Sequence, residues 1–443
     1  MQKNNPTVTR AWCFYDWANS VYSLVITSTI FPIYYSAVAR NPDGSTLVNF
    51  FGFELPSSVL FSYAVSASFL IIAALSPFLT AIADYSGRKK LFMQLFCYLG
   101  AFSCAGLYFF TRDTFTVSVI LFVLASIGFS GSIVFYNAYL PEIATEDQYD
   151  RLSAKGFSMG YIGSVLLLIF NLAMIMQPAW FGIAPENTAL PPRIAFLTTG
   201  IWWFGFAQYT FYYLPSNVYQ RKPRGSWILN GFKELKKVLN QVRELPMLKR
   251  FLLAYFFYNM GVQTVMYVAT IFGIEELQLP DEALIITILI IQLVAIGGAY
   301  AFASLSGKVG NIRALIVAVA IWIGICVGAY FIRGQFDFYV LAAIVGSVMG
   351  GIQSLSRSTY SKLIPATTID HAAFFSFYDV TEKVSIVLGT LAYGMIDQLT
   401  GSMRNSILVL IIFFALGLIF LSTVRWKKAL RASAGEEIAN AGR

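Results

Sequence analysis

Long apolar segments alternate with short polar segments along almost the whole chain. A helix needs about 20 predominantly apolar residues to cross the hydrocarbon core of a bilayer. Segments of this length recur along the sequence and predict an all-α membrane protein with twelve transmembrane helices. The expected helices cover residues 12–39, 58–82, 91–111, 115–139, 153–176, 194–214, 249–273, 283–303, 312–332, 338–360, 373–397 and 403–424.

The composition excludes a water-soluble globular domain. Hydrophobic residues make up 57% of the chain and charged residues 12%, whereas soluble domains contain about 25% charged residues. The surplus of apolar surface must face lipid. The first apolar segment is longer than the core of a signal peptide, so it is expected to be the first spanning helix.

Lys and Arg are distributed unevenly among the connections between the expected helices. They gather in alternate connections, from the N-terminus through segment 215–248 to the C-terminal tail. Because cytoplasmic loops carry an excess of Lys and Arg, both termini are expected in the cytoplasm. Topology therefore accounts for the net charge of +8, and no nucleic-acid partner is expected.

The sequence offers little for a cofactor, a metal site or an enzyme. It has one histidine, His371, and its four cysteines lack metal-ligand spacing. It contains no phosphate-binding loop of the Gly-x-x-x-x-Gly-Lys-(Ser/Thr) type, which excludes an ATP-driven pump within this chain. We expect no cofactor, no metal and no enzymatic activity.

The expected helices divide into two sets of six around a charged central segment. From Ser226 onward, apolar residues recur there at helical spacing between Lys and Arg, which predicts an amphipathic helix at the inner membrane face. Phe14-Tyr15-Asp16 in the first helix is echoed by Phe257-Tyr258-Asn259 in the seventh. Internal repeats are typical of transporters, whose substrate site lies at the repeat interface. The expected units are 1–214 (N-terminal six-helix half), 215–248 (cytoplasmic linker with the amphipathic helix), 249–424 (C-terminal six-helix half) and 425–443 (cytoplasmic tail).

The segment Ala83–Lys90 (ADYSGRKK), between the second and third helices, resembles the signature loop of the major facilitator superfamily. Thr80 stands where that loop usually begins with Gly, and Tyr85 where it usually has a basic residue. The resemblance implies the major facilitator fold, with two pseudo-symmetric six-helix halves. It also implies that helices one, four, seven and ten line a central cavity.

A finer resemblance covers most of the chain. The segments Tyr15–Ser20 (YDWANS), Phe135–Pro141 (FYNAYLP), Gly156–Gly163 (GFSMGYIG) and Tyr378–Lys383 (YDVTEK) are similar to segments of the autophagy-related vacuolar effluxer family and its bacterial "unknown major facilitator" branch. The eukaryotic members are associated with amino-acid export from the vacuole. The substrate of the bacterial members is generally unassigned.

Lys383 lies near the middle of the eleventh expected helix. A Lys at the bilayer centre costs about 2.5–3.5 kcal/mol, so it must face a partner or a hydrated cavity. Asp379 precedes it by one turn on the same face, the favourable order for an ion pair, and Glu382 is its neighbour. We expect either a switchable pair that binds a substrate carboxylate or couples to a proton, or a static pair that holds the helix in place.

Asp16 lies roughly two turns inside the first expected helix, with Asn19 three residues on. The resemblance implies that Asp16 faces the cavity, as a site for proton coupling or for an amine. The alternative is a carboxylate near the cytoplasmic mouth, paired with Arg10 or another basic residue. Uncharged polar side chains in the lining helices either bind solute or join helices: Tyr136, Asn137, Asn259, Gln263 and Gln353.

Asp84, Gly87 and Arg88 are expected to form a conformational latch rather than a substrate site. By resemblance, Asp84 meets the cytoplasmic end of helix eleven when the inner gate is shut, because a helix N-terminus attracts a carboxylate. Glu142 is the expected partner of Arg88. The alternative is simple anchoring of basic residues at the inner face, which we expect for Lys89.

These expectations describe a secondary transporter that moves a small polar solute by alternating access. Amino acids, moved outward, are expected by resemblance, and a zwitterion would suit Lys383 and Asp16 as cationic and anionic sites. Sugars, peptides and drugs are alternative substrates, and a proton gradient or the solute's own gradient is the expected driving force. An integral-membrane enzyme and a non-transporting scaffold are the alternatives of other classes. We expect a monomer in a lipid bilayer, the bacterial inner membrane.

Overall fold

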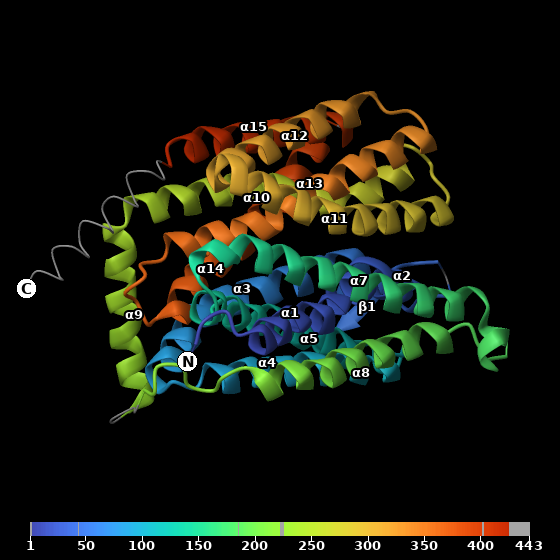
Figure 1. The fold of residues 1–443 in the computed structure, drawn as a ribbon. Coiled ribbons are helices and arrows are strands. Elements are labelled where there is room, and N and C mark those ends of the chain that lie inside the picture. Colours follow the sequence, from blue (N-terminus) through green and yellow to red (C-terminus); the bar gives the residue numbers. More distant parts are fainter. Residues whose placement is uncertain (1, 43, 185, 222–225, 401–402, 425–443) are drawn as a thin grey trace, which may run out of the picture.

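The computed structural model describes the whole chain except residues 1, 43, 185, 222–225, 401–402 and 425–443. The expected cytoplasmic tail, 425–443, lies outside the described residues. Within the described part the chain is almost entirely helical, and its long helices run side by side (Figure 1).

Twelve helical segments of the described chain are long enough to span a membrane, as the apolar pattern predicts. The first runs through α1 (Pro6–Val21), a π-helical section (Tyr22–Ile30) and α2 (Phe31–Ala39). The next five are α3 (Ser57–Ser86), α4 (Lys89–Gly106), α5 (Phe115–Asn137), α7 (Tyr149–Met176) and α8 (Leu190–Tyr213). The last six are α10 (Pro246–Glu275), α11 (Asp281–Val309), α12 (Asn311–Phe331), α13 (Gln335–Leu363), α14 (His371–Thr400) and α15 (Met403–Ser422). We call the helices from α1 to α8 the first half and those from α10 to α15 the second half.

Ten of these segments are also apolar enough to be membrane spans by length and composition. The other two, α8 and α14, have the length and lie among the other helices, but they are more polar. In α14 the polar character comes in part from Asp379, Glu382 and Lys383. Of the two helices that depart from the apolar pattern, α14 is therefore the one with three charges inside it.

The first span begins at Pro6, earlier than the expected start near residue 12. Asn5 caps it with a side-chain oxygen that accepts hydrogen bonds from backbone N–H groups of the first turn. Pro6 is at the first helical position, where its missing N–H costs nothing. The following connection contains a hairpin of β1 (Leu47–Phe50) and β2 (Phe53–Pro56), which the apolar pattern did not predict.

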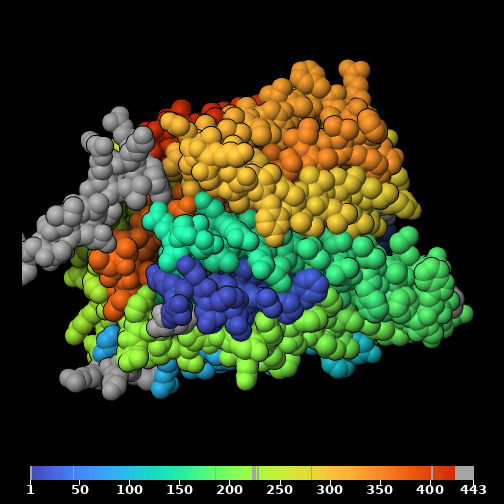
Figure 2. All heavy atoms as spheres, viewed as in Figure 1, coloured from blue at the N-terminus to red at the C-terminus, as the bar shows by residue number. Residues whose placement is uncertain are grey.

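The two halves form bundles that meet along one interface, seen as the boundary between blue-to-green and yellow-to-red atoms in Figure 2. The main contacts across it are made by α3 with α14 and by α7 with α11 and α13. The connecting helix α9 (Trp227–Glu244) lies across the helix ends on the side where α1 begins (Figure 1). Because α9 belongs to the basic segment 215–248, this is the cytoplasmic end.

Small residues on α7 bring this helix against α1. A Cβ on Gly160 would lie 2.4 Å from Ser20 Oγ, and a Cβ on Gly163 would lie 2.8 Å from the backbone oxygen of Trp17. Small residues at a helix interface allow the two backbones to approach closely. This packing holds α1 beside α7 at the level of Asp16.

We expect Gly163→Ala to lower the melting temperature of the detergent-solubilised protein. The added methyl group meets the backbone of α1, and overpacking of this kind costs about 1–3 kcal/mol. A Cβ on Gly205, in α8, would meet nothing within 4 Å, so Gly205→Ala is the control and should leave the melting temperature unchanged or raise it slightly, since Ala favours a helix more than Gly does. Equal melting temperatures for the two variants would contradict the close α1–α7 packing.

Candidate functional site

Arg357 is buried where the two halves meet near the cytoplasmic end of α13, and its side chain is 3% exposed. Its two terminal nitrogens each lie 3.3 Å from Asp16 Oδ2 on α1. The Tyr136 hydroxyl on α5 donates to the same oxygen at 2.7 Å. Arg357 Nε donates to Ser153 Oγ on α7 at 2.9 Å. We call these four residues the Arg357 cluster; one guanidinium ties a helix of the second half to three helices of the first.

Aromatic rings surround the same guanidinium. The Arg357 Cζ atom lies 4.8 Å from the ring centroid of Trp12 and 4.2 Å from that of Phe157. A desolvated cation over a ring gains about 2 kcal/mol, and the ion pair with Asp16 removes the larger cost of an isolated buried charge. The free-energy cost of burying the Arg357 guanidinium is therefore offset by Asp16 and the surrounding rings.

Arg357 is absent from the residues expected at the site, so the prediction of the site from the sequence is incomplete. Its sequence carried a signal, because Arg357 falls inside the expected helix 338–360 and stands among serines that leave space for a guanidinium. For Asp16, the structure has the carboxylate paired with a basic residue near the cytoplasmic mouth. The partner is Arg357 and not Arg10.

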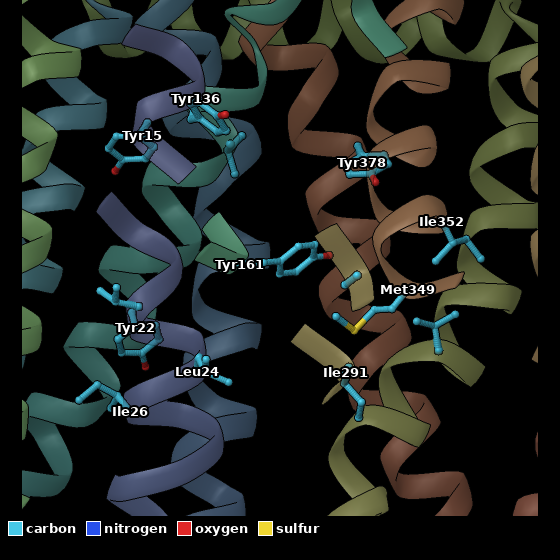
Figure 3. Close-up of a cluster of buried hydrophobic side chains, with 14 of the residues drawn as sticks. Tyr15, Tyr22, Leu24, Ile26, Tyr136, Tyr161, Ile291, Met349, Ile352 and Tyr378 are labelled. Carbon is cyan, nitrogen blue, oxygen red and sulfur yellow. The ribbon is translucent and has the colours of Figure 1, made fainter. Parts of the chain in front are cut away.

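Further polar contacts between the halves lie toward the same end. Asp150, at the start of α7, accepts hydrogen bonds from Lys362 and Asn311 at 2.7 Å each. Deeper in the membrane, the Tyr161 hydroxyl donates to Gln353 on α13 at 2.7 Å, and Figure 3 shows this ring projecting from α7 toward the second half. In the described residues, hydrogen bonds and ion pairs between the halves lie within about 20 Å of the cytoplasmic helix ends. The structure is closed at that end.

Lys383 lies on α14, about 18 Å from the start of the helix, with a side chain that is 6% exposed. Its Nζ is 3.6 Å from Asp379 Oδ1 and 3.6 Å from Glu382 Oε2, which is beyond a direct hydrogen bond. Asp379 Oδ2 accepts a hydrogen bond from Ser76 on α3 at 3.4 Å. We call Asp379, Glu382 and Lys383 the α14 triad; the structure brings them together at the interface and pairs them loosely.

Some of the uncharged candidate residues contact these two groups, and others do not. Asn137 accepts a hydrogen bond from the guanidinium of the Arg357 cluster at 3.4 Å. Asn259, on α10, donates to Ser385 Oγ at 2.6 Å, one turn or less from the α14 triad. Asn19 Nδ2 is buried and has no partner among the described residues. Gln263 is half-buried, and the structure does not join it to either group.

The loop after α3 contacts the start of α14. Asp84 Oδ2 accepts a hydrogen bond from the backbone N–H of Ala373 at 2.8 Å, in the first helical turn, where free N–H groups and the helix dipole favour a carboxylate. Gly87 ends α3 with φ of 67°, the left-handed cap that glycine adopts without strain. This is the contact that the latch hypothesis requires; its role in a transport cycle stays a prediction.

The expected pairing of Arg88 with Glu142 is wrong. Glu142, on the short helix α6 (Leu140–Ile143), forms its ion pair with Lys89, and both side chains are buried. The Lys89 ammonium also lies 4.7 Å from the ring centroid of Tyr139. Lys89 was expected only to anchor the inner face, but a buried acid needs a buried cation, and Lys89 supplies it.

Residues 4–434 match the protein family described as "Vacuole effluxer Atg22 like". The chain belongs to the Atg22-like effluxer family. This Atg22-like protein is 33% identical, over 424 residues and 96% of each chain, to the "Uncharacterized MFS-type transporter YxiO" of Bacillus subtilis. It is 22% identical over 510 residues to "Autophagy-related protein 22" of Gibberella zeae, covering 89% of this chain and 75% of the relative. The resemblance seen in the sequence is confirmed.

Solved structures with the same fold include the proton:xylose symporter XylE, at a TM-score of 0.71 and 14% identity over 95% of both chains. The human organic anion transporter MFSD10 has a TM-score of 0.72 and 13% identity, covering 95% of this chain and all of the other (100%). A bacterial homologue of the iron transporter ferroportin in its outward-facing state has a TM-score of 0.64 and 12% identity, covering 96% and 99%. The Atg22-like protein is thus an integral, multi-pass membrane transporter with the major facilitator fold.

We expect Arg357→Met to open the cytoplasmic end of this Atg22-like protein. Loss of one partner from a buried pair costs about 3–5 kcal/mol. In Arg357→Met the closed arrangement bears this cost, because it keeps Asp16 buried without a cation. A cysteine placed at Ser354, buried between the halves, should then react faster with a membrane-impermeant maleimide added at the cytoplasmic side.

The control for this experiment is Arg313→Met, because Arg313 is exposed at the start of α12. This variant should leave the labelling rate unchanged. The four native cysteines are buried, and the parent without the new cysteine measures their background. Slow labelling in Arg357→Met, equal to that in Arg313→Met, would show that the Arg357 cluster does not hold the cytoplasmic end closed.

Proposed function

We propose that this transporter exports small zwitterionic solutes, with amino acids as the substrate class, by alternating access. The observation that carries the proposal is the α14 triad: a buried lysine with two carboxylates, placed where the halves meet and paired loosely. Export is supported by the family's description as a vacuole effluxer. Sugars, peptides and drugs are the competing substrate classes.

Lys383 is the group we assign to the substrate carboxylate. Its side chain is 6% exposed, so its charge has little water to interact with, yet both acidic neighbours stay at 3.6 Å. An ammonium has three N–H donors, and charge-assisted hydrogen bonds are roughly twice as strong as neutral ones. A substrate carboxylate that approaches Lys383 Nζ within hydrogen-bond distance would therefore form charge-assisted hydrogen bonds that Asp379 and Glu382, at 3.6 Å, do not form.

The substrate amine is assigned to the acids of the same triad and not to Asp16. Asp16 is already held by Arg357 and Tyr136, so it is the less available anion. Asp379 Oδ1 is buried and accepts no hydrogen bond in the described residues, and the Glu382 side chain is 21% exposed. One cation and two anions on adjacent turns of α14 match a carboxylate and an amine on one small molecule.

Alternating access assigns a different task to the Arg357 cluster. It lies closer to the cytoplasmic helix ends than the α14 triad does, and it joins α13 to α1, α5 and α7. In this proposal it is the inner gate, which must part before solute enters from the cytoplasm. We further propose that the driving force is a proton or solute gradient, that the protein acts as a monomer, and that it resides in a bacterial cell (inner) membrane; the bacterial origin of the YxiO relative supports a bacterial source.

The test is transport by the purified protein in liposomes, screened with labelled amino acids. Lys383→Ala should lower flux of the transported class by about tenfold or more, the equivalent of a lost charge-assisted interaction. Lys308→Ala is the matched control, because Lys308 is exposed at the cytoplasmic end of α11. Flux that survives in Lys383→Ala would overturn the assignment of the site, and flux of sugars alone would overturn the substrate class.

A second experiment tests proton coupling through Glu382. Glu382→Gln keeps the side-chain shape and cannot titrate, so we expect stimulation of flux by a proton gradient to be lost while counterflow exchange of solute continues. Glu276, near the outer ends of the helices and bound to Arg404, provides the control variant Glu276→Gln. Gradient stimulation that persists in Glu382→Gln would place coupling elsewhere.

A further inference from the structure

The linker between the halves is attached firmly to the first half. On α9, a Cβ at Gly231 would lie 2.5 Å from the Ile82 side chain of α3. The Phe232 ring lies 4.4 Å, centroid to centroid, from the Phe78 ring on the same helix. Upstream, the Asn217 side chain covers Gly87, where a Cβ would come within 2.7 Å of it. The linker therefore follows the first half, although it leads to the second.

Two linker cations reach across to the second half at Asp370, the residue immediately before α14. The Asp370 side chain is 1% exposed. Lys237, on α9, donates to Asp370 Oδ2 at 2.8 Å. Arg221 forms an ion pair with the other carboxylate oxygen and donates to the backbone oxygen of Ile369 at 3.0 Å. We call Asp370 with Arg221 and Lys237 the linker clamp.

We infer that the linker clamp is a lock on the cytoplasmic end, and that Asp370, Arg221 and Lys237 are positioning residues of the transport cycle. The inference rests on the alternating access of the proposed function. In that cycle the start of α14 must leave the first half for the cytoplasmic end to open. Since α9 is packed on α3, the same movement separates Asp370 from both cations.

The clamp is adjacent to the Asp84–Ala373 contact, so α14 is held at its first turn from two sides. Asp84 belongs to the first half itself, whereas Arg221 and Lys237 belong to the linker. A buried carboxylate that loses its cations is destabilised strongly. The closed arrangement therefore gains from the clamp, and an open arrangement must solvate Asp370 instead.

The clamp is ionised at cytoplasmic pH. Burial alone would raise the pKa of Asp370, but its interactions with Glu234, Lys237 and Arg221 outweigh burial and hold that pKa below its usual value. A carboxylate with a lowered pKa stabilises the folded arrangement above its ordinary pKa and loses this effect only as the pH falls through the lowered value. Around neutral pH Asp370 is therefore ionised, as its ion pairs with Lys237 and Arg221 require.

The inference is tested by measuring the distance between spin labels at Asp147→Cys and Ala366→Cys, exposed positions on cytoplasmic loops of the two halves. The labels are attached in a background without the native cysteines, and the protein is held in lipid nanodiscs. We expect Asp370→Asn to increase the long-distance, open population by about tenfold, as for loss of hydrogen bonds to a charged group. Lys236 is exposed like Lys237 but forms no ion pair within the described residues, so Lys236→Ala should leave the distribution unchanged.

A double-mutant cycle separates a clamp from a general loss of stability. If Lys237 acts through Asp370, Lys237→Ala should increase the open population in the parent protein and have no further effect in Asp370→Asn. Additive effects, or an unchanged distribution in Asp370→Asn, would overturn the inference. If Asp370→Asn does not fold, the double variant Arg221→Ala/Lys237→Ala tests the same lock, because both cations are more exposed than Asp370 and their loss disturbs the fold less. The distances require no substrate, so a failed flux screen would not be mistaken for a failed clamp.

Discussion

The closed arrangement of this protein depends on the buried charge of Arg357, because its counter-charge, Asp16, comes from the opposite half. Arg357 arises from α13, while the groups that make it tolerable come from α1, α5 and α7. The approach of α1 to α7 is in turn possible because Gly156 leaves room beside Asp16, where a Cβ would lie 2.4 Å from its carboxylate. The small residues of α7 are thus needed for Asp16 to reach the Arg357 guanidinium.

The two charged groups differ in how completely they are satisfied. The Arg357 guanidinium is fully engaged, by a carboxylate, a hydroxyl, a backbone oxygen and aromatic rings. The Lys383 ammonium has its acids at 3.6 Å and the Phe69 ring at 5.7 Å. Full engagement suits a group that holds two bodies together, and incomplete engagement suits a group that exchanges partners. This contrast in geometry supports separate roles for the two groups.

The number and place of the spanning helices could be predicted from the sequence because a membrane imposes a simple length and apolarity on each of them. The hairpin at 47–56 escaped prediction, since its strands are short and only partly buried. Lys383 stood out because it interrupts an apolar helix. Arg357 did not, because it lies close enough to a helix end to resemble an ordinary inner-face cation, and its partners are distant in sequence. Glu142 pairs with Lys89 and not with Arg88. Which of two adjacent residues forms the pair depends on the direction of their side chains, which a loop motif does not specify.

Because the Arg357 cluster stabilises the closed cytoplasmic end, it also affects the apparent affinity for a solute that enters from the cytoplasm. If solute enters from the cytoplasm, it meets a protein whose binding-competent form is only a fraction of the population, and its apparent dissociation constant is the intrinsic one divided by that fraction. A tighter inner closure therefore weakens apparent affinity in direct proportion. Such a carrier would remain idle at low cytosolic concentrations and respond when its cargo accumulates, so that the strength of one ion pair sets an overflow threshold for the cell.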